Sequence, residues 1–367
     1  MTEWTTTTIG SVITLQRGFD ITREQQRPGK VPVISSGGIS SFHDTPATQG
    51  PGVVIGRKGT LGKVFYTDEN YWPHDTTLWV KDFKGNSPRF VYYFLSQLNT
   101  LKLNVGSANP TLNRNHVHPI QIEWPSVSEQ HAIVRVLDAL DNKININARI
   151  AAKGNELSTS LPIRNSNHFT TLSRLVTHSR MQIDPASLEG RLVDHYSLPA
   201  FDTSQMPETC ASTKIKSSKF LIQGEALLVS KLNPRIPRIW QAFPRNDRVA
   251  LASTEFLVLT SAGEATIAEI WAVCSQPHFT AELSEKVTGT SNSHQRVNPK
   301  EVLAAKVLDP RSLPDSARNQ IKILTERVQS ARLESVLLAE IRDTLLPKLV
   351  SGELRVKDAE RLVESAI

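Results

Sequence analysis

Residues 129–144 read EQHAIVRVLDALDNKI, in which apolar residues recur three or four positions apart, as on one face of a helix. The stretch overlaps Ser126-Val127-Ser128-Glu129, a capping-box sequence that indicates a helix N-terminus. The same pattern returns 188 positions later in the chain. The predicted seam of the first helix is Ile133, Val136, Leu140, Asn147, Ile150 and Leu157, and that of the second is Ile321, Leu324, Val328, Ser335, Leu338 and Leu345.

Neither predicted helix can bury such a stripe alone. At 1.5 Å per residue, residues 128–157 and 315–346 would span about 45 Å and about 48 Å. We expect an antiparallel coiled coil, because a whole domain connects the two helices, with Pro347 and Gly352 ending the second. The alternative, in which each helix lies on its own domain, is disfavoured because globular helices average about 11–12 residues.

The repetition extends to the segments that precede the helices. Residues 8–17 (TIGSVITLQR) and 171–180 (TLSRLVTHSR) share threonine, aliphatic and arginine positions at unchanged spacing. Two shorter segments, 54–58 and 77–80, are paired in the same way with 227–231 and 254–257. In the first half, we predict strands at 52–55, 77–80 and 120–125 and a helix at 89–98.

These patterns predict an α+β protein with two globular domains in tandem repeat, separated and joined by the two helices. The predicted boundaries are 1–125 for the first domain, 126–163 for the central helix, 164–311 for the second domain, 312–350 for the C-terminal helix and 351–367 for a tail.

The composition suits a globular protein with more than one core: 367 residues, 39% hydrophobic and 21% charged. We expect no membrane span and no signal peptide, and with only Cys210 and Cys274 we expect a cytoplasmic protein without disulfides. The net charge of +6 favours a polyanionic partner, and residues 205–250 contain eight basic residues against three acidic ones. A solvated basic face without a partner is the alternative.

The motifs indicate binding and no catalysis. The glycine-rich segment 55–63 has the wrong spacing for a nucleotide-binding phosphate loop, and Val64 stands where a metal-binding hydroxyl would be needed. His116 and His118 could share one face of a strand, but no third metal ligand follows at a suitable spacing. We therefore predict no catalytic residues, no bound metal and no cofactor held by this chain.

Basic and short polar side chains on loops are suited to DNA, because they reach phosphates and base edges. Asn104–Asn115 and Thr288–Arg296 form a further matched pair of polar loops. The predicted DNA-binding residues are Arg57, Lys58, Thr60, Lys63, Ser107 and Asn109 in the first domain and Lys231, Asn233, Arg235, Arg238 and Asn292 in the second.

Residues 129–144, together with LLPKLVSGEL at 345–354, resemble conserved regions of Type I restriction-modification specificity subunits. The resemblance implies two target recognition domains, each reading one half of a split, asymmetric double-stranded DNA sequence. It also implies modification subunits that methylate adenine with S-adenosylmethionine, and restriction subunits that use ATP and Mg²⁺. Three alternatives stay open: a subunit of a methylation-only complex, a stand-alone enzyme, and a protein adaptor without DNA binding.

Overall fold

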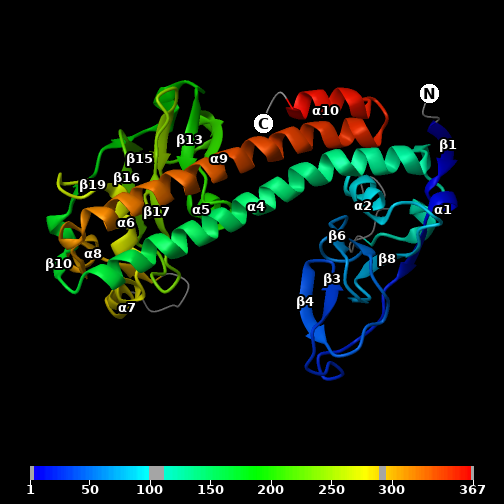
Figure 1. The fold of residues 1–367 in the computed structure, drawn as a ribbon, viewed down its shortest axis with the longest axis horizontal. Coiled ribbons are helices and arrows are strands. Elements are labelled where there is room, and N and C mark those ends of the chain that lie inside the picture. Colours follow the sequence, from blue (N-terminus) through cyan, green and yellow to red (C-terminus); the bar gives the residue numbers. More distant parts are fainter. Residues whose placement is uncertain (1–3, 99–110, 289–294, 365–367) are drawn as a thin grey trace. The chain divides into compact units, whose positions relative to one another are not determined.

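The computed structural model describes residues 4–98, 111–288 and 295–364. The chain divides into two compact units, Met1–Asn145 with Val336–Ile367, and Ile146–Ser335. Each unit contains one globular domain and parts of two long helices, α4 (Val127–Asn165) and α9 (Asp315–Val350) (Figure 1). The backbone N–H of Glu129 donates to the Ser126 hydroxyl at 3.4 Å, so the capping sequence does start α4.

The end of α9 differs from the expectation at Pro347 but not at Gly352. Pro347 lies inside the helix, three residues before its last residue, although its ring lacks the N–H that would donate to the preceding turn. Gly352, at φ +77°, follows the last helical residue and suits the left-handed position there. The expected tail contains a further helix, α10 (Val356–Glu364), whose Val356 and Ala359 are buried in the core of the first unit.

The first domain is built on a four-stranded sheet in the order β2-β8-β5-β6, with antiparallel neighbours. Strand β9 returns the chain to β1 before α4 begins. Its elements are β1 (Trp4–Thr8), α1 (Ile9–Val12), β2 (Thr14–Arg17), β3 (Val31–Ser35), β4 (Gly38–His43), β5 (Gly52–Gly56), β6 (Val64–Thr67), β7 (Trp72–Pro73), β8 (Thr77–Asp82), α2 (Pro88–Ser96), α3 (Arg114–Val117) and β9 (Gln121–Pro125).

The second domain contains a sheet in the equivalent order, β11-β19-β16-β17, again antiparallel throughout, and adds a five-stranded sheet, β12-β15-β18-β13-β14. Its elements are β10 (Phe169–Thr171), β11 (Val176–Ser179), β12 (Gln182–Ile183), β13 (Leu192–Tyr196), α5 (Leu198–Thr203), β14 (Glu208–Ala211), β15 (Lys219–Ile222), β16 (Ala226–Ser230), β17 (Ile239–Ala242), β18 (Val249–Ala252), β19 (Phe256–Ser261), α6 (Ile267–Cys274), α7 (Pro277–Glu285), β20 (Val287–Thr288), β21 (Arg296–Val297), α8 (Pro299–Ala304) and β22 (Lys306–Leu308).

The backbone hydrogen bonds correct the register of the internal repeat. The N–H of Gly56 donates to the carbonyl of Lys63, and the N–H of Ser230 donates to that of Arg238. Gly56 is therefore equivalent to Ser230, and Lys63 to Arg238. The pairing of 54–58 with 227–231 had matched Gly56 with Val229, which is one position away. The segment 77–80 shifts by two positions, because Thr77 and Phe256 occupy the same place in their ladders. Short apolar runs carry no register information of their own.

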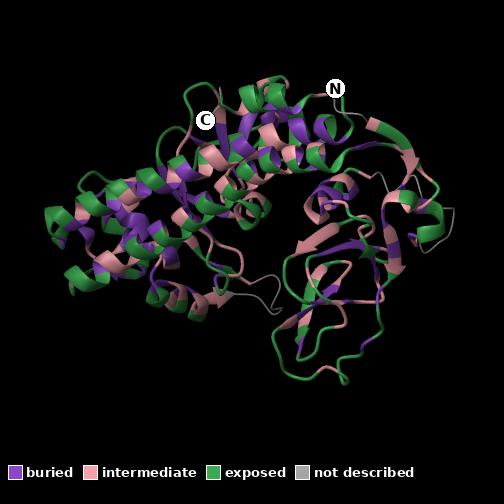
Figure 2. Ribbon diagram, turned by 45° about the vertical axis from the view of Figure 1, so that its right-hand side comes forward, coloured by how far each residue is buried: buried purple, intermediate pink, exposed green. Residues whose placement is uncertain are grey.

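In the first unit, the helices pack through large aliphatic side chains. Leu140 and Leu338 are fully or almost fully buried, and the core cluster that contains them also includes α2 and α10 residues. Figure 2 shows buried and exposed residues alternating along the long helices. The predicted seam residues in this cluster are Ile133, Val136, Leu140, Leu338 and Leu345.

In the second unit, the helices meet through smaller and more polar residues. The Asn147 amide donates to Glu334 at 2.8 Å, and a Cβ on Gly154 would lie 2.5 Å from the Val328 Cγ2. Residue numbers rise along one helix as they fall along the other, so the helices run antiparallel here. Ile321 and Val328 are buried, whereas Ile150, Leu324 and Ser335 are half-buried.

The expected seam residue Leu157 is 50% exposed. The buried positions at this level are Ala151, Gly154 and Ser158, because glycine removes the side chain that would keep α9 at a distance. The sequence pattern placed Leu157 on the seam because the pattern records only apolar character and not the size of a side chain.

The first domain is attached to the helices by a network of charges. Arg89 of α2 donates to Asp138 of α4 at 2.7 Å, and Tyr93 donates to Asp138 and Asp141 at 2.7 and 2.6 Å. Arg342 of α9 donates to Asp141 at 2.9 Å. Every charged group in this network has a partner of opposite sign, as a partly buried network requires.

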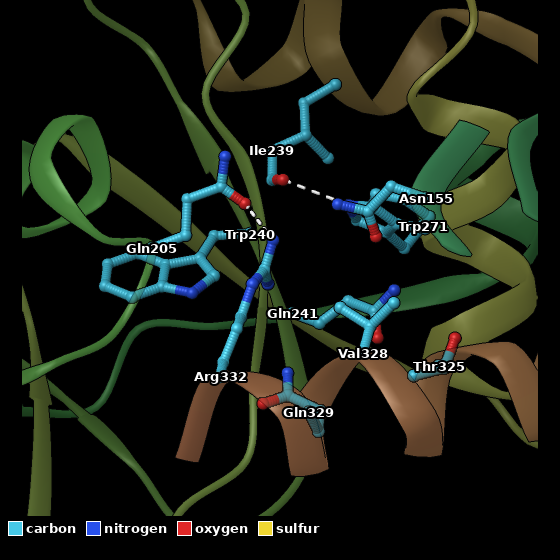
Figure 3. A pocket seen from close by; sticks show the side chains of 10 residues that line it. All are labelled: Asn155, Gln205, Ile239, Trp240, Gln241, Trp271, Thr325, Val328, Gln329 and Arg332. Carbon is cyan, nitrogen blue, oxygen red and sulfur yellow. Dashed lines mark hydrogen bonds between the residues drawn. The ribbon is translucent and has the colours of Figure 1, made fainter. Parts of the chain in front are cut away.

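The second domain meets the helices around a small polar cavity (Figure 3). Arg332 of α9 donates to the Gln205 side chain, and burial lowers the pKa of Arg332 to about 10. Figure 3 shows Gln241 and Thr325 facing the same cavity, and the buried Gln241 Oε1 and Thr325 Oγ1 have no hydrogen-bond partner. No described carboxylate forms an ion pair with Arg332, so this junction leaves a partly buried charge without a counter-ion.

Candidate nucleic-acid interface

The turn between β5 and β6 presents three of the predicted DNA-binding residues to solvent. Lys58, Thr60 and Lys63 are exposed, and the Lys63 ammonium lies 5.2 Å from the centre of the Phe65 ring. A Cβ on Gly56 would come within 2.1 Å of the Thr60 carbonyl, so only glycine fits the start of this tight turn. The turn therefore holds exposed side chains on a constrained backbone.

Arg57 is placed differently from its neighbours. It is half-buried, and its guanidinium donates to the carbonyl of Asp75 at 3.2 Å. Burial, and then the nearby charge of Arg17, lower the pKa of Arg57. Arg57 is thus a fixed cation at the base of the turn, while Lys58 extends freely.

The equivalent turn of the second domain joins β16 to β17. Arg235 is exposed, whereas Lys231 is half-buried at the place that Arg57 occupies in the first domain. Asn233 adopts φ +47°, a left-handed conformation that asparagine tolerates better than most residues. Of these three residues, Arg235 is the most accessible to a ligand.

Arg238 is engaged within its own domain. Its guanidinium makes a two-pronged ion pair with Asp202, at 2.7 and 2.8 Å, and its side chain is only 13% exposed. The hydrogen bond raises the pKa of Arg238 and lowers that of Asp202. A DNA contact by Arg238 would have to compete with this carboxylate.

The positive charge that residues 205–250 present to solvent is smaller than their count of basic and acidic residues indicates. Arg245 pairs with the buried Asp194 at 2.7 Å, and Arg248 lies 3.8 Å from the same carboxylate. Lys219 is buried, and its ammonium donates to the Ser217 hydroxyl and carbonyl. The neutralising acids, Asp194 and Asp202, lie before the window in sequence and were therefore missed.

Three predicted residues, Ser107, Asn109 and Asn292, lie outside the described residues. The end of the first polar loop is described, and it borders an open hollow of about 520 Å³ on the first domain. Amide side chains, three arginines and one aromatic ring gather there: Gln16, Arg17, Phe19, Arg57, Arg114 and Asn115. Sequence analysis placed Arg114 and Asn115 in a polar loop without assigning them a role.

The two histidines considered as metal ligands do not lie on a strand. His116 is in α3 and exposed, and His118 follows that helix. The N–H of Leu15 donates to His118 Nε2 at 3.0 Å, and burial lowers the pKa of His118, so this neutral ring has a structural contact. Within residues 4–98, 111–288 and 295–364, no group of His, Cys, Asp and Glu is arranged to hold a metal.

None of the helices in the described part of the chain combines the length and apolar character that crossing a membrane requires.

Comparison with known proteins gives one family match and two structural matches. Residues 1–153 match the family model of the Type I restriction modification DNA specificity domain. The chain is similar in structure to the Type-I restriction-modification system S subunit from M. genitalium, with a TM-score of 0.63 and 17% identity over 95% of this chain and 96% of that chain. The HsdS subunit from Thermoanaerobacter tengcongensis matches with a TM-score of 0.35 and 13% identity, over 96% of this chain and 97% of that chain. A search of curated proteins gives no match.

The fold thus defines a protein of two related α+β domains joined by a pair of long, packed helices, and it is similar to the fold of the M. genitalium subunit. Residues 1–153 are thus similar to the Type I restriction modification DNA specificity domain, and the whole chain shares the fold of the M. genitalium subunit.

Proposed function

We propose that this chain is the non-catalytic DNA-binding subunit of a Type I restriction-modification complex and recognises a bipartite, asymmetric double-stranded DNA target. The observation that carries the proposal is the equivalence of the two domains. Each has a four-stranded sheet in the same order, and each places a cation, Arg57 or Lys231, directly after the first strand of the hairpin, β5 or β16. Two related readers suit two half-sites, and their different turns suit an asymmetric sequence.

The helices would set the distance between the half-sites. At 1.5 Å per residue, the 39 residues of α4 extend over about 58 Å, more than one turn of B-DNA, which is about 34 Å. Modification and restriction subunits would supply the chemistry, using S-adenosylmethionine and ATP with Mg²⁺ respectively. On the part of α9 that belongs to the first unit, the exposed Val336 and Leu337 offer an apolar contact for such a partner.

The test is methylation by the complex of the full chain with its modification subunits, on a library of random duplex DNA. Lys58→Ala should weaken selection at one half-site, and Arg235→Ala at the other. Lys322→Ala, an exposed cation on α9, is the control and should change neither half. Equal loss over both halves from either variant would contradict the assignment of one reader to each half.

The salt dependence of binding separates this proposal from a protein adaptor. Contacts to phosphates release counterions, so affinity should fall steeply between 50 and 200 mM salt, by about 10³-fold if about six phosphates are contacted. A complex whose DNA affinity is absent or insensitive to salt would favour the adaptor.

A further inference from the structure

The equivalence of the two domains extends to a second loop beside each turn. The N–H of Leu112 donates to the carbonyl of Arg57, and the N–H of Val297 donates to that of Lys231. The next residue is asparagine in both domains: Asn113 accepts from the N–H of Asn115, and Asn298 from that of Lys300, each at 3.0 Å. The backbone frame is therefore the same, although sequence comparison did not align these residues.

Within this common frame, the two following residues differ. Arg114 and Asn115 of the first domain correspond to Pro299 and Lys300 of the second. The first pair offers a guanidinium fork and an amide, whereas the second offers a ring without donors and a single ammonium. A shared scaffold with different functional groups is what two readers of different sequences require.

The surroundings of Arg114 favour contact with a ligand. Arg114 and Asn115 are exposed and border the hollow that also contains Arg17, Phe19 and Arg57. Arg17 pairs with Asp20 at 2.8 Å and with Asp75 at 3.1 Å, and Arg57 is held by the Asp75 carbonyl. Arg114 makes no ion pair with any described residue, so among these three arginines its guanidinium is the one available for a new partner.

We propose that Arg114 and Asn115 read base edges of the half-site bound by the first domain, and that Lys300 contacts a phosphate at the equivalent place in the second. This rests on the proposed DNA-binding function and assigns specificity within it. An arginine fork matches O6 and N7 of guanine, and an asparagine amide matches N6 and N7 of adenine. Lysine acts as a point charge, which suits a phosphate.

The variants Arg114→Ala, Arg114→Lys and Asn115→Ala test the proposal in the complete complex with modification subunits. The readout is the methylated sequence selected from a random duplex library, together with affinity as a function of salt. Arg114→Ala and Asn115→Ala should each relax preference at one or two base pairs of a single half-site, by about 5- to 150-fold, equivalent to about 1–3 kcal/mol. Arg114→Lys should relax the same base pair, because it keeps the charge and loses the fork.

Lys300→Ala is the matched variant of the second domain. It should lower affinity for all sequences alike and reduce the salt slope by about one unit, leaving both half-site sequences unchanged. Asn113 and Asn298, whose side chains hold the loop backbone, are kept in all these variants. We therefore expect each variant to have an unchanged melting temperature.

Two results would overturn the proposal. In the first, Arg114→Lys behaves as the unsubstituted chain, and Arg114→Ala lowers affinity without changing the sequence preference. That result would make Arg114 a phosphate contact. The other is an unchanged target sequence for both Arg114→Ala and Asn115→Ala. If the unsubstituted complex selects no bipartite sequence at all, the proposed function itself fails, and the proposal fails with it.

Discussion

In the first unit, Arg89 and Tyr93 of α2 meet Asp138 and Asp141 of α4, and Arg342 of α9 completes the network. In the second unit, a smaller set of charges joins α6 to α9: Arg318 donates to the buried Glu269 at 2.7 Å and to the Glu264 carbonyl at 2.8 Å. By the 188-residue repeat, Asp141 corresponds to Gln329 and Arg342 to Gly154. Ser87 caps α2 and Thr266 caps α6. When the two helices are aligned on these caps, Arg89 corresponds to Ala268 and Tyr93 to Ala272.

The two junctions therefore hold related domains by different sets of contacts. The first relies on mutually compensating charges around a leucine-rich helix pair. The second combines the ion pair between Arg318 and Glu269 with close helix approach at Gly154, and its Arg332 is bonded to an uncharged side chain beside a polar cavity. Helices that repeat each other in polarity thus differ in what their individual side chains contribute to stability.

The largest effect is expected at positions that the repeat makes equivalent, Leu345 and Leu157. Leu345→Ala should lower the free energy of unfolding by about 3 kcal/mol, because this side chain is 4% exposed in the leucine-rich core. Leu157→Ala should cost about 0.5 kcal/mol or less, because Leu157 is half-exposed. Urea denaturation of the full chain measures both, and equal losses would contradict the observed difference in burial.

Asp141→Asn tests the charge network of the first unit. We expect a loss of about 2–3 kcal/mol, because Arg89 and Arg342 then lose a partly buried counter-charge. The matched control is Asp343→Asn, which removes the other carboxylate bonded to Arg342. That carboxylate is 64% exposed, so its loss should cost about 0.5 kcal/mol. Similar losses from both variants would show that burial does not distinguish the two pairs.

Gly154→Val tests close helix approach in the second unit. The added Cβ would overlap Val328, so we expect a loss of about 1–3 kcal/mol through overpacking. Combining it with Val328→Ala should recover part of this loss, because the second substitution removes the overlapping atom. Additive losses in the double variant, measured by urea denaturation, would place the cause elsewhere.

The smallest effect, and the only gain, is expected from Arg332→Met. Replacing a buried charge that lacks a counter-ion with an apolar side chain of similar length should stabilise the chain by about 1 kcal/mol. In a thermal melt this would raise the transition by about 2–4 °C. Arg89→Met is the counterpart in the first unit and should lower stability, because it leaves Asp138 without its cation. Destabilisation by Arg332→Met would show that its bond to Gln205 outweighs the burial cost.

Much of the architecture follows from local patterns. The apolar period gave both long helices, and the strands expected at 52–55, 77–80 and 120–125 appear as β5, β8 and β9 with ends shifted by at most two residues. The helix α10 was missed, because residues 356–364 are mostly charged and only Val356 and Ala359 are buried. Local periodicity detects a helix better when its apolar face is broad.

The candidate site was only partly accessible to sequence reasoning. The basic turns were identified, but the ion pair of Arg238 with Asp202 joins residues far apart in the chain. The same holds for Arg114 and Asn115, which reach the hollow of Arg17 and Arg57 only when the loop hydrogen-bonds to Arg57.

The sequence by itself determined the tandem repeat, the two long helices and the basic character of the turns, because periodicity and charge are local properties. Only the tertiary structure decided the register of the repeat, since that depends on hydrogen bonds between strands. It also decided which cations remain available to a ligand, because acids from distant segments neutralise some of them. The choice of Gly154 and Ser158 over Leu157 as buried residues likewise depends on how closely a partner helix approaches, which no single helix specifies.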